Sequence, residues 1–354
     1  MPTLLDLPFE LRTRIIKYVV ECPLKPSPNP FEAKEVDAIE YHDLQYRSWS
    51  GGSDVVYPRP QHHFASSACL PLLITSRQLF TDTQDILTRL SNTDYVIDIA
   101  VKNDFKLFVT WLSVPHLTTH ISTLYTNIRL FGHIIERQTA RRQLGDGGRR
   151  GFHWHFYAVL ERILRYGPVG LKKRPGEEPP KHRWKIKNFQ DREMFIDTLV
   201  LNFQADELDY PFPAKDVTFA QWWSRHWGRD EWEDEQQKEA FSASKTRPEW
   251  LCTYLEDWIA GLLGMSYHYS GYGSVLYERI GTICMLVDGK FHCEIELSNR
   301  LARMQFSDPS SMMGHLPTNE RETGFESWRK ETLARREAHG FAAGVAQGQQ
   351  VMTE

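Results

Sequence analysis

The first twenty residues carry apolar side chains at helical spacing. Residues 4–20, LLDLPFELRTRIIKYVV, predict one helix that begins at Pro8 and ends before Pro23. At 100° per residue its apolar positions fill an arc of about 200°, interrupted by Arg12, whereas a surface helix usually buries a stripe nearer 100°. We therefore expect two apolar neighbours, one in its own domain and one in a partner protein. The alternative is that both neighbours belong to this chain.

A second helix is predicted over residues 70–90, LPLLITSRQLFTDTQDILTRL, with Asn92 as its stop. Apolar pairs recur every seven residues, at Leu72-Leu73, Leu79-Phe80 and Ile86-Leu87, and they stack on one side of the helix. This side is expected to hold the first helix. The Pro/Gly/Ser-rich residues 23–65 between the two helices predict a long insertion.

From residue 94 the pattern changes to alternating strands and helices. Such alternation predicts a mixed α/β domain with a largely parallel sheet. The leucine-containing strands resemble leucine-rich-repeat strands, although their spacing is irregular. Strands are expected at 95–101, 121–131 and 194–203, and helices at 104–114 and 152–167. The predicted organisation is a helical region at 1–92, an α/β recognition domain at 94–305 and a polar, partly disordered tail at 306–354.

Asp288-Gly289 predicts a late two-residue β-hairpin. Its expected register places Cys284 opposite Cys293, both facing the core. His292, Glu294 and Glu296 then point to the other face, where they can bind a cation or act as acid and base, or simply face solvent. We favour the solvent-facing interpretation for the polar side chains and core packing for the two cysteines.

Composition and charge argue against several classes of function. The net charge of -4 offers no bulk attraction to nucleic acid or to an anionic membrane, and no apolar run reaches the length of a membrane helix. Five scattered cysteines indicate reduced thiols in a cytoplasmic or nuclear protein. Residues Lys172–Lys187 hold seven Lys/Arg against two Glu, which fits a nuclear-import signal or a solvated loop. No P-loop, G-x-S-x-G or H-E-x-x-H motif occurs, so we expect no cofactor or metal.

The segment Leu7-Pro8-Phe9-Glu10-Leu11-Arg12, followed by Ile15-Ile16, resembles the start of an F-box. More specifically, it resembles the F-box-like N-termini of a large group of filamentous-fungal proteins. Those proteins continue with a helix of the form LL-x-T-C-R-Q, which Leu72, Leu73, Thr75, Arg77 and Gln78 match. Two departures are Ser76 in the place of the cysteine and the insertion at 23–65.

This resemblance implies docking onto the small linker protein that joins F-box proteins to a cullin in a ubiquitin ligase. It assigns the contact to Leu7, Pro8, Leu11, Ile15 and Ile16. The leading hypothesis is therefore a non-enzymatic interaction protein that brings an unknown target to the ligase. The alternatives are a globular protein whose F-box-like helix is only a core element, and an enzyme that uses His292 and Glu294.

Overall fold

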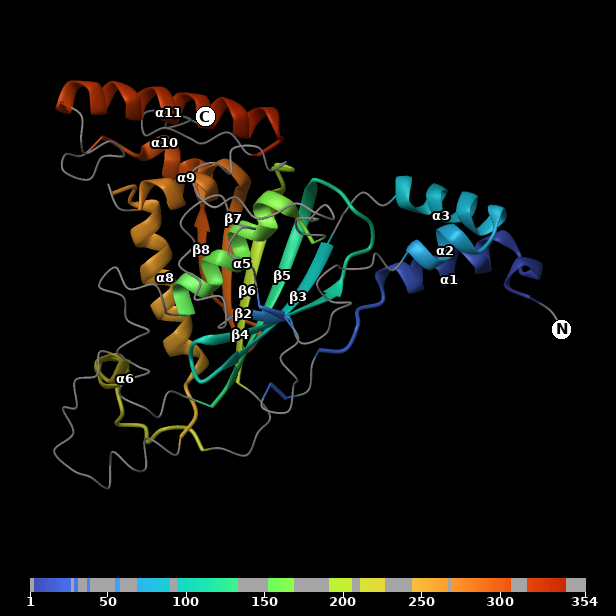
Figure 1. Cartoon of the computed structure of the whole chain (residues 1–354), viewed down its shortest axis with the longest axis horizontal. Coiled ribbons are helices and arrows are strands. Elements are labelled where there is room, and N and C mark those ends of the chain that lie inside the picture. The colour runs from blue at the N-terminus through green and yellow to red at the C-terminus, as the bar shows by residue number, and fades with distance from the viewer. Residues whose placement is uncertain are drawn as a thin grey trace, which may run out of the picture.

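A computed structural model describes most of the chain (Figure 1). The described residues are 3–26, 29–30, 37–38, 55–57, 69–89, 94–132, 152–168, 191–205, 211–226, 244–266, 269–306 and 317–341. Asn92, most of the insertion at 23–65, the basic stretch Lys172–Lys187 and the end of the expected tail lie outside these ranges.

An eight-stranded sheet in the order β1-β2-β4-β3-β5-β6-β7-β8 forms the centre of the fold. Its interior strands β3, β5, β6 and β7 are parallel, and β4 and β8 pair antiparallel with β3 and β7. The predicted mixed α/β class with a largely parallel sheet and a late hairpin is confirmed. The strands are Asp37–Ala38 (β1), Val55–Tyr57 (β2), Asp94–Lys102 (β3), Lys106–Ser113 (β4), His120–Phe131 (β5), Phe195–Ala205 (β6), Ile280–Val287 (β7) and Lys290–Glu296 (β8).

The predicted helix at 104–114 is wrong, because β4 occupies these residues. Asn103 and Asp104 adopt positive φ angles of 54° and 61°, which reverse the chain between β3 and β4. Asn and Asp tolerate this left-handed conformation better than most residues. Residues 107–113 are all buried, so the strand shows no polar alternation that distinguishes it from a buried helix. The β3–β4 hairpin also interrupts any regular series of leucine-rich-repeat strands.

Helices pack on one face of the sheet and bury the main core. In Figure 1, α5 lies over the strands, α8 runs alongside the β8 side of the sheet, and α9, α10 and α11 gather at one end of the sheet. The core alternates as expected, with Ile99, Leu124, Leu199 and Met285 contributed by four neighbouring strands. The helices are Phe152–Tyr166 (α5), Phe219–His226 (α6), Pro248–Leu263 (α8), Ser270–Arg279 (α9), Leu297–Arg303 (α10) and Thr318–Ala338 (α11).

A separate small cluster holds the N-terminal helices together. A 3-10 turn, Leu4–Asp6 (η1), precedes α1 (Phe9–Glu21), which packs on α3 (Arg77–Arg89); α3 also packs on α2 (Leu70–Thr75). The expected single second helix is two helices, because Ser76 is extended and its hydroxyl accepts a hydrogen bond from the Leu79 amide at 3.2 Å. Serine favours this position at a helix start. The predicted role of the second region, to hold the first helix, is confirmed by the shared cluster of Ile16, Val20, Cys69, Leu79 and Ile86.

Residues 318–338 of the expected polar tail form α11, which packs on α9 and α10. Phe325, Thr332 and Arg336 are its buried residues. Only this thin side of the helix faces the core, which explains its polar sequence.

Candidate functional site

One side of α1 is buried against α3. Its three buried residues, Arg12, Ile16 and Val20, follow the four-residue spacing that places side chains above one another on a helix. Ile16 and Val20 are completely buried in the cluster shared with α3. This side accounts for the first of the two apolar neighbours that the sequence predicts.

Arg12 interrupts the apolar arc because it anchors the helix. Its Nε donates to the Asp82 carboxylate on α3 at 2.6 Å, and both side chains are buried. Its Nη1 also donates to the carbonyls of Leu5 and Leu7, at 3.2 and 2.9 Å. A buried charge is tolerated when it is paired and hydrogen-bonded in this way. Arg12 therefore fixes the turn before α1 and the position of α1 on α3.

The other half of the apolar arc is exposed. Leu11, Ile15, Tyr18 and Val19 have exposed fractions of 47%, 40%, 73% and 40%. At 100° per residue they span about 100° of the helix, next to the buried side. We call these four residues the exposed α1 face. Polar residues that include Glu10, Arg14 and Lys17 border it.

The structure divides the five residues that the F-box resemblance assigns to partner contact. Leu11 and Ile15 belong to the exposed α1 face, Pro8 is exposed and Leu7 is half-buried. Ile16 is completely buried against α3, so it is not part of the exposed α1 face. Tyr18 and Val19 lie outside the motif. The helical periodicity alone identifies them as part of the same arc.

Exposed apolar residues concentrate in this region of the chain. Of the thirteen large hydrophobic residues that are exposed among the described residues, nine lie between positions 5 and 80. Ile74 on α2, at 77%, and Phe80 on α3, at 42%, are among them. Contiguous exposed apolar surface on a folded protein commonly marks an interaction site.

A second accessible surface lies on the face of the sheet opposite the main core. Thr123, Tyr125 and Asn127 of β5, with Thr198 and Asn202 of β6, alternate with core residues, and they are half-buried or exposed. The register pairs Thr123 with Thr198 and Asn127 with Asn202. We call these five residues the open sheet face. Its hydroxyl and amide groups offer both hydrogen-bond donors and acceptors.

The late hairpin forms at Asp288-Gly289 as predicted, but its register differs from the prediction. Leu286 pairs with Phe291, whereas Met285 pairs with Cys293, so His292 is an extra residue in β8. Cys284 therefore lies opposite Glu294, not opposite Cys293 as expected. The sequence contains no local signal for this β-bulge.

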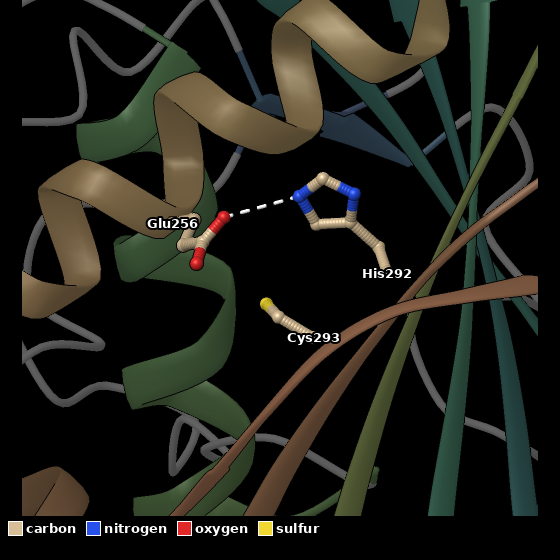
Figure 2. A group of neighbouring side chains, drawn as sticks. All are labelled: Glu256, His292 and Cys293. Carbon is tan, nitrogen blue, oxygen red and sulfur yellow. Dashed lines mark hydrogen bonds and ion pairs between the residues drawn. The ribbon is translucent and has the colours of Figure 1, made fainter.

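The bulge separates the residues of the enzyme hypothesis. The His292 imidazole lies 3.1 Å from the Glu256 carboxylate on α8, and Cys293 lies beside them (Figure 2). Glu294 is not among the grouped side chains. Glu296 accepts hydrogen bonds from the amides of Ser298 and Asn299 and caps α10. The structure thus does not bring His292 and Glu294 together as an acid–base pair.

Comparisons with known proteins gave no match to a family model, a curated protein or a solved structure. Within the described ranges, every helix is too short or too polar to cross a bilayer.

Proposed function

We propose that this protein is a protein–protein interaction module that resembles an F-box substrate adaptor. In this proposal the exposed α1 face docks onto the linker protein of a cullin-type ubiquitin ligase. The sheet region presents an unknown target, and the chain performs no bond chemistry itself. The single observation that carries the proposal is that half of the apolar arc of α1 stays exposed although the helix is firmly anchored on α3.

The exposure distinguishes this proposal from the alternative in which α1 is only a core element. A helix whose apolar residues served the core alone would bury them, because burial of a leucine or isoleucine side chain is worth about 1.5–3 kcal/mol. Leu11 and Ile15 are exposed in the free protein, so they do not contribute this burial free energy to its stability. In our proposal, binding of the partner buries these two side chains and supplies that free energy to the complex.

The open sheet face is the surface that we assign to the target. Its residues come from β5 and β6, in the centre of the sheet, so the backbone that carries them is rigid. Fixed donors and acceptors at a regular spacing favour a polar, extended partner. This assignment keeps the ligase surface and the target surface on different parts of the chain.

A binding assay with the purified linker protein tests the docking proposal. Wild type should bind, and the double variant Leu11→Asp/Ile15→Asp should lose binding by at least about a hundredfold, because two carboxylates would be buried in an apolar contact. The matched control Arg14→Ala/Lys17→Ala changes two exposed polar positions of the same helix and should bind like wild type.

Circular dichroism on all three proteins separates lost docking from lost folding. The proposal requires that the double variant keep the helical signal of wild type. No binding by wild type would remove the adaptor proposal, and so would equal binding by the folded double variant.

A further inference from the structure

Three side chains with metal-ligating atoms meet where α8 crosses the edge strand β8. The ligating atoms of Glu256, His292 and Cys293 all lie within 4.8 Å of one another. Figure 2 shows Glu256 projecting from the helix toward the two strand residues, which point to the same side. His292 and Glu256 already lie 3.1 Å apart. These contacts join segments that are 36 residues apart in the chain.

The β-bulge explains how two consecutive strand residues serve one site. In a regular strand, neighbouring side chains point to opposite faces. The extra residue at His292 breaks this alternation, so the imidazole and the Cys293 thiol both reach Glu256. Bulges are known to redirect side chains at functional positions. A solvent-facing hairpin needs no such irregularity.

The Cys293 thiol is partly buried beside the Glu256 carboxylate. Burial, the charge of Glu256 and a hydrogen bond to Glu256 raise the pKa of Cys293 to about 12. Burial, with smaller effects of Cys293 and Glu256, raises the pKa of the neighbouring Cys252 to about 12. A bound dication would neutralise the Glu256 carboxylate and the Cys293 thiolate together.

We propose that Glu256, His292 and Cys293 form a binding site for a zinc-type divalent cation. One carboxylate oxygen, one imidazole nitrogen and one sulfur match the donors that Zn²⁺ takes in proteins, at bond lengths of about 2.0–2.3 Å. Such bonds place the ligating atoms of a tetrahedral site about 3.3–3.8 Å apart, so small side-chain movements close the site. The three ligands leave a fourth position for water, and His292 and Glu256 are accessible enough to admit it.

Binding exchanges a proton for the metal. The Cys293 thiol loses its proton and forms the S–Zn bond, the carboxylate and the neutral imidazole donate lone pairs, and one proton leaves to solvent. The bound ion also joins α8 to the sheet edge.

Calorimetric titration of the full chain with Zn²⁺, and spectroscopy with Co²⁺, test this proposal. We expect one ion per chain, a thiolate-to-cobalt charge-transfer band and a higher melting temperature on Zn²⁺ addition. Cys293→Ser should abolish the charge-transfer band, and His292→Ala should weaken binding by at least about tenfold.

Matched controls use residues of the same type outside the site. Cys284→Ser changes a half-buried cysteine on the neighbouring strand, and His120→Ala removes another histidine paired with a carboxylate, Asp197, at 2.6 Å. Both should bind the metal like wild type. The absence of stoichiometric binding, or a cobalt spectrum that Cys293→Ser leaves unchanged, would overturn the proposal. His292 is exposed on the edge strand, so His292→Ala tests it even if the cysteine variant does not fold.

Discussion

The two packed regions of this protein differ in how much of their apolar surface is buried. In the sheet region, helices and strands bury nearly all the large hydrophobic residues, and its exposed ones are scattered, such as Leu117 and Phe291. The N-terminal helices share a core of only five buried residues and leave an adjoining apolar stripe on α1 exposed. The sheet region therefore buries most of its apolar side chains, whereas the helical region leaves part of its apolar surface exposed, and it is this exposed part that our proposal assigns to a partner.

Each region also contains a buried arginine, held in a different way. Arg12 pairs with a carboxylate, Asp82, and ties two helices together. Arg336 on α11 is 1% exposed and donates to the carbonyls of Tyr277 and Ile280 and to the Ser298 hydroxyl. Arg336 thus joins the end of α9, the start of β7 and α10. Arg12 is thus held by a charged partner, whereas Arg336 is held by hydrogen bonds to neutral groups.

The largest loss of stability should come from Arg336→Ala. The substitution leaves two buried carbonyls and a hydroxyl without their donor and opens a cavity, which should lower the free energy of unfolding by about 3–5 kcal/mol. Urea denaturation measures this change. The adjacent Arg335 is half exposed and lies 3.3 Å from Glu278, so Arg335→Ala should cost less than about 1 kcal/mol. Equal losses in the two variants would contradict the assigned role.

Asp191→Asn tests a second buried charge cluster of the sheet region, whose contribution to stability should depend on pH. Asp191 accepts from Arg165 at 2.8 Å and from Arg279 at 2.7 Å. Burial alone raises the pKa of Asp191, but the hydrogen bonds and charge of Arg279 outweigh it and lower that pKa. The carboxylate therefore stabilises the fold above its unfolded pKa of about 3.8, and this stability is lost as the pH falls through the folded value.

Asp191→Asn should accordingly lower the free energy of unfolding by about 2–3 kcal/mol at neutral pH. The difference from wild type should shrink as the pH falls below about 4, because the wild-type carboxyl then becomes neutral too. Urea denaturation over a pH series measures both effects. A difference that is independent of pH would exclude the ionised carboxylate as the stabilising group.

Arg12→Ala should destabilise the helical region by about 2–3 kcal/mol, since it leaves Asp82 buried without its partner. Hydrogen exchange should show faster exchange in α1 and α3, with α5 and β6 unchanged. Arg14→Ala, at an exposed position of the same helix, serves as the control. Faster exchange throughout the chain would show that the two regions unfold together.

Ser76→Ala should have the smallest effect. Removal of the hydroxyl that caps α3 at the Leu79 amide should cost about 1 kcal/mol of local stability. Exchange rates in the first turn of α3 report this loss, and Ser76→Asp, which retains an acceptor, should restore most of it. No change in either variant would mean that the helix break does not depend on the cap.

The sequence identifies elements where the pattern is local. Strands β3, β5 and β6, helix α5 and the Asp288-Gly289 turn all follow from periodicity or turn chemistry. Contacts between distant residues carry no such signal, so the pairing of Arg12 with Asp82 and of Glu256 with His292 was not predictable. The bulge at His292 moves Cys293 by one register position, and it is visible only in the pairing of β7 with β8. The sequence predicted the wide apolar arc of α1. Which half of that arc is buried depends on where α3 lies, which the sequence does not show.

Neighbouring residues of α1 provide the most direct test of the docking proposal. Ile15 is 40% exposed and Ile16 is completely buried, so Ile15→Asp and Ile16→Asp place the same charge on the two sides of one helix. Linker-protein affinity and hydrogen exchange in α1 should be measured for both. We expect Ile15→Asp to keep wild-type protection and lose binding, and Ile16→Asp to unfold the helical region. Binding by Ile15→Asp at wild-type affinity would contradict the account.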